Sequence, residues 1–225
     1  MIGKQTQSFL GIVLLLSNCQ PKQNETKETD SAKQTIIADS SEAINSPDRS
    51  GASTEEKNKS ITPAQLIVPG KSIGQTALQM KAEVINQILG KSDRSDAAMG
   101  KSWAVWYSRP TASDTIRKET TIYFATNMGG PDEASRVKQI RVTSPFFQTA
   151  GHVGVGTPLK AIQQAFPNLK AAKTYTSVKT KQSITILDDA ASGIAFEFNP
   201  SQTCVAVVVH EPQQPVNTIY INLFP

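Results

Sequence analysis

The chain has 225 residues, of which 38% are hydrophobic, and a formal net charge of +4. This length is enough for one medium domain or two small ones, and so small and dispersed a positive charge argues against a nucleic-acid-binding protein. The longest apolar run, residues 9–16, is far shorter than the roughly 20 residues of a transmembrane helix. Of the 14 aromatic residues only Phe9 precedes Trp103. The amino-terminal part is therefore not expected to form a core of its own.

Residues 1–18 have the pattern of a secretory signal. Lys4 stands in a short polar start, the apolar run follows, and small residues come next. These are the three parts of an export signal that is removed after translocation, and they differ from an anchoring helix in length. We expect the chain to be exported.

The segment Leu16-Ser17-Asn18-Cys19 resembles the lipobox of bacterial lipoproteins, with Asn18 at a place where Gly or Ala is usual. The resemblance implies a diacylglycerol thioether on Cys19, which would anchor the chain to a membrane through lipid. In the lipoproteins that this segment resembles, an Asp after the cysteine retains the protein on the inner membrane. Gln20 stands at that position here and favours the outer membrane, facing the periplasm. Ordinary signal cleavage beside an incidental cysteine is the alternative. The only other cysteine is Cys204, so no disulfide framework is expected.

Residues 19–66 are expected to carry the lipidated cysteine and a disordered linker. Residues 20–62 hold six basic and eight acidic side chains among Ser, Thr, Asn, Gln and Ala, without an aromatic residue. Such a segment buries too little apolar surface to offset its chain entropy. As a flexible coil, it would reach roughly 35 Å from the membrane.

Two short helices are expected in the remaining sequence, 77 residues apart. The first follows Thr76-Ala77-Leu78-Gln79, which has the form of a capping box, and its apolar spacing through Ile85 ends at Gly90. The second follows Gly156-Thr157-Pro158, and its apolar face includes Ile162 before Pro167 ends it. The recurrence indicates one pattern used twice.

Several short β-rich segments follow each helix. They are residues 103–107, 120–126 and 137–143 after the first, and 173–178, 183–187, 193–198, 203–209 and 218–224 after the second. Without intervening helices these strands have to pair mainly antiparallel. The expected fold class is therefore α+β, with two tandem units at residues 67–149 and 150–225, each a short helix packed on an antiparallel sheet.

A family resemblance accompanies this pattern. The segments Gly90-Lys91-Ser92-Asp93, Ala98-Met99-Gly100 and Trp103 to Tyr107 resemble the tandem-repeat fold of the β-lactamase inhibitory protein and the outer-membrane lipoproteins of the SmpA/OmlA type. Members of this fold bind other proteins, so the resemblance implies a binding module without catalytic residues.

The sequence offers no catalytic or metal-binding constellation. His152 and His210 have no Cys or carboxylate at ligand spacing, whereas zinc needs three or four ligands. Cys204 lies in an apolar strand, where a buried thiol is expected. Asp93 and Asp96 are more typical of loop caps than of an acid/base pair. No cofactor, metal or catalytic residue is therefore expected.

Aromatic residues provide the candidate contact surface. Strand alternation places Trp103 and Tyr107 on one face and Trp106 on the other. Trp106, Phe146 and Phe147 are therefore the possible contacts with a partner, although most of the cluster is expected in the core.

The expected function is that of a lipid-anchored envelope protein that binds another envelope protein, or acts as a scaffold, without catalysis. An envelope hydrolase with an unrecognised site and a structural lipoprotein are the alternatives.

Overall fold

The computed structural model describes residues 60–112, 114–219 and 221, all of which belong to one compact unit, Glu55–Pro225. The signal, Cys19 and most of the expected linker lie outside the described residues. In chain order the elements are β1 (Leu66–Val68), β2 (Ser72–Ile73), β3 (Thr76–Ala77), α1 (Ala82–Leu89), β4 (Arg94–Ala98), β5 (Lys101–Tyr107), β6 (Glu119–Thr126), β7 (Ser135–Val142), β8 (Gln148–Thr149), α2 (Leu159–Ala165), β9 (Lys170–Thr176), β10 (Ser183–Asp189), β11 (Ile194–Phe198) and β12 (Cys204–His210).

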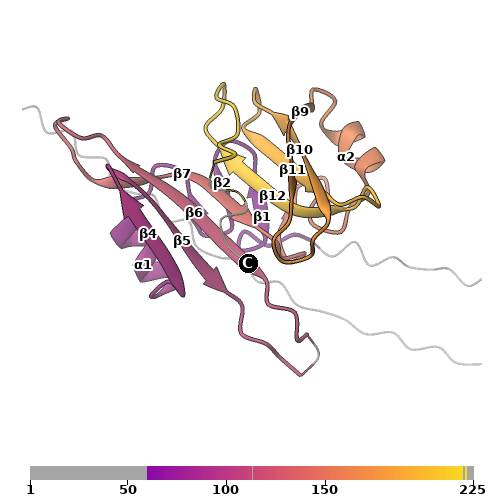
Figure 1. Ribbon diagram of the computed structural model, residues 1–225, viewed down its shortest axis with the longest axis horizontal. Coiled ribbons are helices and arrows are strands. Elements are labelled where there is room, and N and C mark those ends of the chain that lie inside the picture. Colours follow the sequence, from indigo (N-terminus) through magenta and orange to yellow (C-terminus); the bar gives the residue numbers. More distant parts are fainter. Residues whose placement is uncertain (1–59, 113, 220, 222–225) are drawn as a thin grey trace, which may run out of the picture. The chain divides into compact units, whose positions relative to one another are not determined.

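The described strands form two sheets (Figure 1). The large sheet has eight strands in the order β4-β5-β6-β7-β12-β11-β10-β9, and every neighbouring pair is antiparallel. The small sheet has the order β3-β2-β1-β8 and contains the parallel pair β1–β8. The expectation of mainly antiparallel pairing is confirmed.

The expected fold class, α+β with two tandem units, is wrong. The described region is β-rich, with 42% of its residues in strands and 9% in helices. Although each helix precedes four strands of the large sheet, β7 pairs with β12 and joins all eight strands into one sheet. Ile85 of α1 and Ile162 of α2 also belong to the same hydrophobic cluster. The sequence pattern could not reveal this, because the pairing joins strands that lie far apart in the chain.

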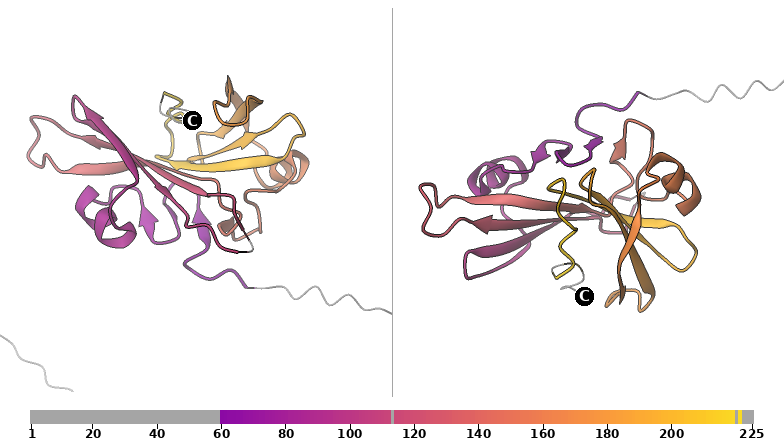
Figure 2. Two further views of the ribbon diagram at one scale, coloured as in Figure 1. Left: turned by 60° about the horizontal axis from the view of Figure 1, so that its bottom comes forward. Right: turned by 90° about the horizontal axis from the view of Figure 1, so that it is seen from above.

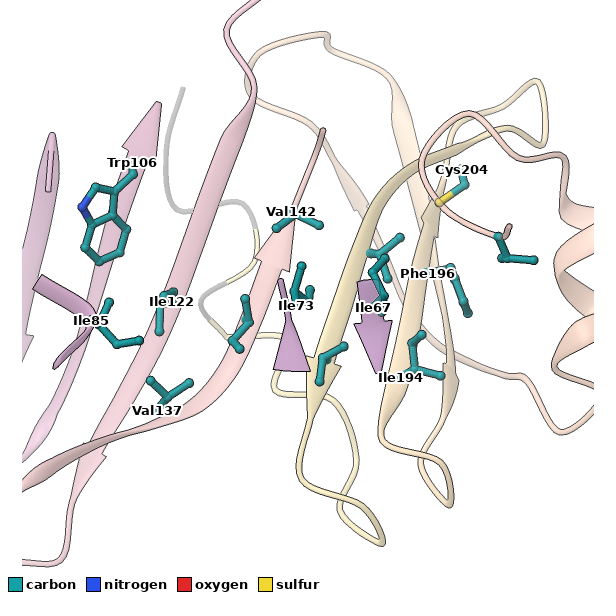
Figure 3. Packing of buried hydrophobic residues seen from close by; sticks show 14 of the residues in the cluster. Ile67, Ile73, Ile85, Trp106, Ile122, Val137, Val142, Ile194, Phe196 and Cys204 are labelled. Carbon is teal, nitrogen blue, oxygen red and sulfur yellow. The ribbon is translucent and has the colours of Figure 1, made fainter. Parts of the chain in front are cut away.

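One face of the large sheet carries the main core (Figure 3). Ile122 of β6 and Phe196 of β11 are fully buried on this face. Ile85 of α1, Ile162 of α2 and Ile67 of the small sheet pack against the strands there. Complete burial of such a side chain contributes about 1.5–3 kcal/mol to stability. In the described part of the chain no helix has the length and apolar character needed to cross a membrane.

The helix boundaries differ from the predicted ones at their starts. Thr76 lies in β3 and its hydroxyl donates to the Ile73 carbonyl oxygen, so it does not cap α1. Gln79 has a φ of 67°, which no helical residue adopts. The predicted end at Gly90, which has a φ of 76°, is confirmed. α2 begins at Leu159, one residue later than Pro158 predicts, and ends before Pro167.

Seven of the eight predicted strands agree with the observed strands of the large sheet to within a few residues. β4 and the four strands of the small sheet were not expected, and all five residues of β4 are exposed. Of the expected strand at residues 218–224, the described residues 218, 219 and 221 are not in a strand. The segment that follows β12 lies on the opposite side of the large sheet from α1 (Figure 2).

Candidate functional site

The face of the large sheet opposite the main core is covered at one end. Val216 and Ile221, from the segment after β12, pack there against Ile186, Ala195 and Val208 of the sheet. The Val216 N–H donates to Asp188 Oδ2 at 2.9 Å and so fixes this segment to β10. No described residue of this segment lines the pocket at the other end of the same face, which we call the open end.

The open end contains a pocket of about 640 Å³. Its lining includes residues of all eight strands of the large sheet and of two connections, at residues 116–118 and 177–182. We call it the cross-strand pocket. A volume of this size lies within the usual range for ligand-binding clefts.

The floor of the cross-strand pocket is an ionic network centred on Arg141. Its Nε and Nη2 donate to Oε1 and Oε2 of Glu197 at 2.7 and 2.9 Å, and its Nη1 donates to Glu119 Oε1 at 2.7 Å. The Tyr175 hydroxyl donates to Glu197 Oε2 at 2.7 Å, and the Thr121 hydroxyl donates to Glu119 Oε1 at 2.6 Å. The network therefore runs from β6 through β7 and β11 to β9.

Strand register brings these side chains together. Arg141 lies opposite Thr121 on one side and Val208 on the other, and Glu197 lies opposite Ala206. Arg141 and Glu197 are therefore on strands separated only by β12, and the small side chain of Ala206 leaves space for the guanidinium to reach the carboxylate. Their planar two-bond contact is the strongest geometry for such a pair.

The charged side chains of the floor stabilise one another. The Glu197 side chain is 0% exposed and that of Arg141 14%. Burial by itself lowers the pKa of Arg141. The charge and hydrogen bonds of Glu197 and the charge of Glu119 raise it by a larger amount, so the pKa lies above its ordinary value and the guanidinium stays charged. Burial, followed by the charge of Glu197, raises the pKa of Tyr175 above its ordinary range. The phenol is therefore neutral at physiological pH and acts as a hydrogen-bond donor.

The rim of the cross-strand pocket is cationic. Arg94, Arg117, Lys118 and Lys179 line it, and with Arg141, Glu119 and Glu197 they give the lining a formal charge of +3, which the Asp114 partner of Lys118 reduces to +2. Lys118 pairs with Asp114 at 3.5 Å. Neither Arg117 nor Lys179 forms an ion pair with another described residue.

None of the three aromatic residues expected at a contact surface lines this pocket. Trp106 is 8% exposed and lies in the main core, where its Nε1 donates to the Gly90 carbonyl oxygen at 3.0 Å. Trp106 is therefore a core residue and not an exposed contact. Phe147 packs against the main core, while Phe146 is 51% exposed, and the two rings meet edge to face at 5.2 Å. Phe146 alone remains available at the surface. Cys19, the expected lipidation site, lies outside the described residues.

The remaining reactive side chains are engaged elsewhere. Cys204 belongs to the main core, where burial and then the charge of Glu197 raise the pKa of its thiol. His210 is buried and its Nε2 lies 2.9 Å from Asp188 Oδ1, beneath the segment that follows β12. In the described ranges no three His, Cys, Asp or Glu side chains are grouped to hold a metal ion.

Sequence reasoning missed every residue of the ionic floor. A usable signal was present, since Glu197 is a lone charge between Phe196 and Phe198, and Arg141 stands between Ile140 and Val142. A charge inside an apolar strand requires a partner when it is buried. The pairing of β7, β12 and β11, which the sequence does not disclose, decides which partner it finds.

Comparisons with known proteins give no relative. No family model matches the chain, and neither a curated protein nor a solved structure matches it.

Proposed function

We propose that this chain is a lipid-anchored protein of the bacterial cell envelope that binds another envelope protein through the cross-strand pocket, without catalysis. Its lipid is attached to Cys19, and its folded part faces the periplasm from the outer membrane. The segment Leu16-Ser17-Asn18-Cys19, followed by Gln20, supports this location.

The observation that carries the binding role is the internally paired floor of the pocket. Arg141 is committed to two carboxylates and Tyr175 to one of them. Side chains tied in this way have little freedom to accept or release protons, but they give a rigid surface of fixed shape and charge. Such preorganisation lowers the entropy cost of binding.

The lipid anchor is tested with Cys19→Ser. The substitution removes the acyl acceptor, and we expect the protein to move from the membrane fraction to the soluble fraction on cell fractionation. Unchanged membrane retention of the variant would reject lipid anchoring and leave the binding role untouched.

The binding role is tested by crosslinking full-length protein in intact envelopes and comparing two matched variants. Ile116 lines the pocket and is 63% exposed, while Ile219 is 71% exposed and lies outside the lining. We expect Ile116→Ser to reduce the yield of a specific crosslinked protein several-fold and Ile219→Ser to leave it unchanged. Recovery of no protein partner, together with stabilisation of the fold by a small molecule, would favour the hydrolase alternative.

A further inference from the structure

The cationic rim of the cross-strand pocket indicates the chemistry of the partner. We infer that the pocket binds an acidic polypeptide segment of the partner protein, in extended conformation, with carboxylates placed against Arg117 and Lys179. This inference rests on the proposed function and names the partner's contacting surface.

The first argument is the origin of the rim charges. Arg94 comes from β4, Arg117 and Lys118 from the connection before β6, and Lys179 from the connection between β9 and β10. These elements belong to opposite ends of the strand order, and the fold brings them to one opening. Because neither Arg117 nor Lys179 forms an ion pair with another described residue, their convergence on this opening favours an anionic ligand.

The second argument is the length of the site. The lining includes residues from all eight strands, from Arg94 on β4 to Tyr175 on β9. Neighbouring strands lie about 4.8 Å apart, so eight strands of a flat sheet would span about 34 Å, and the site is shorter because both ends of the strand order line one opening. An extended chain covers about 3.3 Å per residue, so the occupant has fewer than about ten residues. A single inorganic anion would use only one corner of this site.

The third argument concerns where the carboxylates of the segment lie. The floor carries two carboxylates, Glu119 and Glu197, against the single cation Arg141. Because this excess negative charge repels an anion, acidic side chains are held at the rim. The apolar side chains of Ile184 and Val205, together with Tyr107, line the same pocket and offer contacts for the rest of the segment.

The probe is a fluorescein-labelled octaglutamate peptide, titrated with purified full-length protein at low ionic strength and followed by fluorescence anisotropy. We expect saturable binding that weakens as salt is added, because exposed charges are screened over about 10 Å at 0.1 M salt. Arg117→Glu/Lys179→Glu should weaken binding about tenfold or more, which corresponds to about 1.4 kcal/mol.

The matched control is Lys71→Glu/Lys160→Glu. It changes the net charge by the same amount, and both lysines are exposed and lie outside the pocket lining. We expect the control to bind octaglutamate nearly as well as the unmodified chain. An equal loss in both double variants would show only a response to net charge and would overturn the inference.

Glu119→Gln is a second variant that predicts the opposite change. It removes the excess negative charge of the floor, and we expect octaglutamate to bind more tightly by about twofold or more. Unchanged or weaker binding, with the folded structure retained by circular dichroism, would contradict the placement of the ligand over this floor.

Competitors separate the possible sources of the anion. Octaglutamine at the same concentration should not compete, and free glutamate or inorganic phosphate should compete only weakly. Competition by either small anion at the concentration at which unlabelled octaglutamate competes would overturn the polypeptide assignment. Equal competition by an eight-nucleotide single-stranded DNA would overturn it as well.

Failure of this inference is distinguishable from failure of the proposed function. If the envelope crosslink depends on Ile116 and survives Arg117→Glu/Lys179→Glu, the binding role stands and the acidic segment is rejected. If octaglutamate binds as expected while no protein is crosslinked in envelopes, the protein-binding role is rejected.

Discussion

The two faces of the large sheet are built from alternate residues of the same strands, yet they are held by different forces. On β11, Phe196 and Phe198 face the main core, while Glu197 between them faces the cross-strand pocket. The core face is apolar and covered by helices and the small sheet, whereas the pocket face buries an ionic network. Apolar contacts adapt to small changes in geometry, but a buried charge without its partner is strongly destabilising. The pocket face is therefore stable only while its network is complete.

Among the substitutions that test this difference between the two faces, Glu197→Ala should cause the largest loss of stability. It leaves the buried guanidinium of Arg141 with only Glu119 as its ionic partner, and we expect a loss of about 3–5 kcal/mol in the free energy of unfolding. Denaturant titration measures it. The double variant Arg141→Met/Glu197→Leu should lose less than Glu197→Ala, because it leaves no uncompensated charge. A double variant that loses as much stability as Glu197→Ala, or more, would contradict this account.

Ile85→Ala and Ile162→Ala test the core face. Both side chains are 0% exposed and come from the two helices that pack on the sheet. We expect each variant to lose about 2–5 kcal/mol, from lost burial and the cavity left behind. Val84→Ala on the exposed side of α1 is the control, with an expected loss below about 0.5 kcal/mol. A comparable loss of stability in all three variants would show that the face of α1 that carries Ile85 is not the one buried in the core.

Asp188→Ala tests the covered end of the pocket face. The substitution removes the acceptor of the Val216 N–H and the partner of His210, and we expect a loss of about 1–3 kcal/mol. Hydrogen exchange at the Val216 amide should become faster, while Gln214→Ala, which changes an exposed side chain, should leave it unchanged. An amide that remains protected in Asp188→Ala would show that the segment is held by its apolar contacts alone.

Local patterns gave the strands because alternation and β-branched residues are properties of single segments. One exception is β4, whose Arg-Ser-Asp-Ala-Ala sequence has no such pattern and which pairs with β5. The strands of the small sheet are the others, because two or three residues are too few to show alternation. The helix face through Ile85 was predictable because apolar spacing is also a property of a single segment. The capping box was not reliable, because the Thr76 hydroxyl had a competing acceptor in the Ile73 carbonyl.

The fold class and the site depend on pairing between distant segments. Joining β7 to β12 turns two expected units into one sheet, and it places Arg141 within reach of Glu197, 56 residues away. Neither residue has a local sequence signature beyond a charge among apolar neighbours. Trp106 was a poor guide to a contact surface, because its side chain is large enough to fill the core and its indole N–H finds an acceptor there.

The smallest expected effect is a pH dependence specific to the pocket face. The raised pKa of Tyr175 means that the folded state retains the phenolic proton at a pH where the unfolded chain, with an ordinary tyrosine pKa near 10, releases it. The stability that this group contributes is therefore fully present below about pH 10 and is lost as the pH rises towards the folded-state pKa.

Tyr175→Phe should be less stable than the unmodified chain at neutral pH, because it lacks the bond to Glu197, and the difference should narrow above about pH 10. Cys204 also has a raised pKa, but it is present in both proteins and cancels in the difference. Urea midpoints measured for both proteins between pH 8 and 11 provide the comparison, and a difference that stays constant over this range would show that Tyr175 ionises equally in the folded and unfolded states.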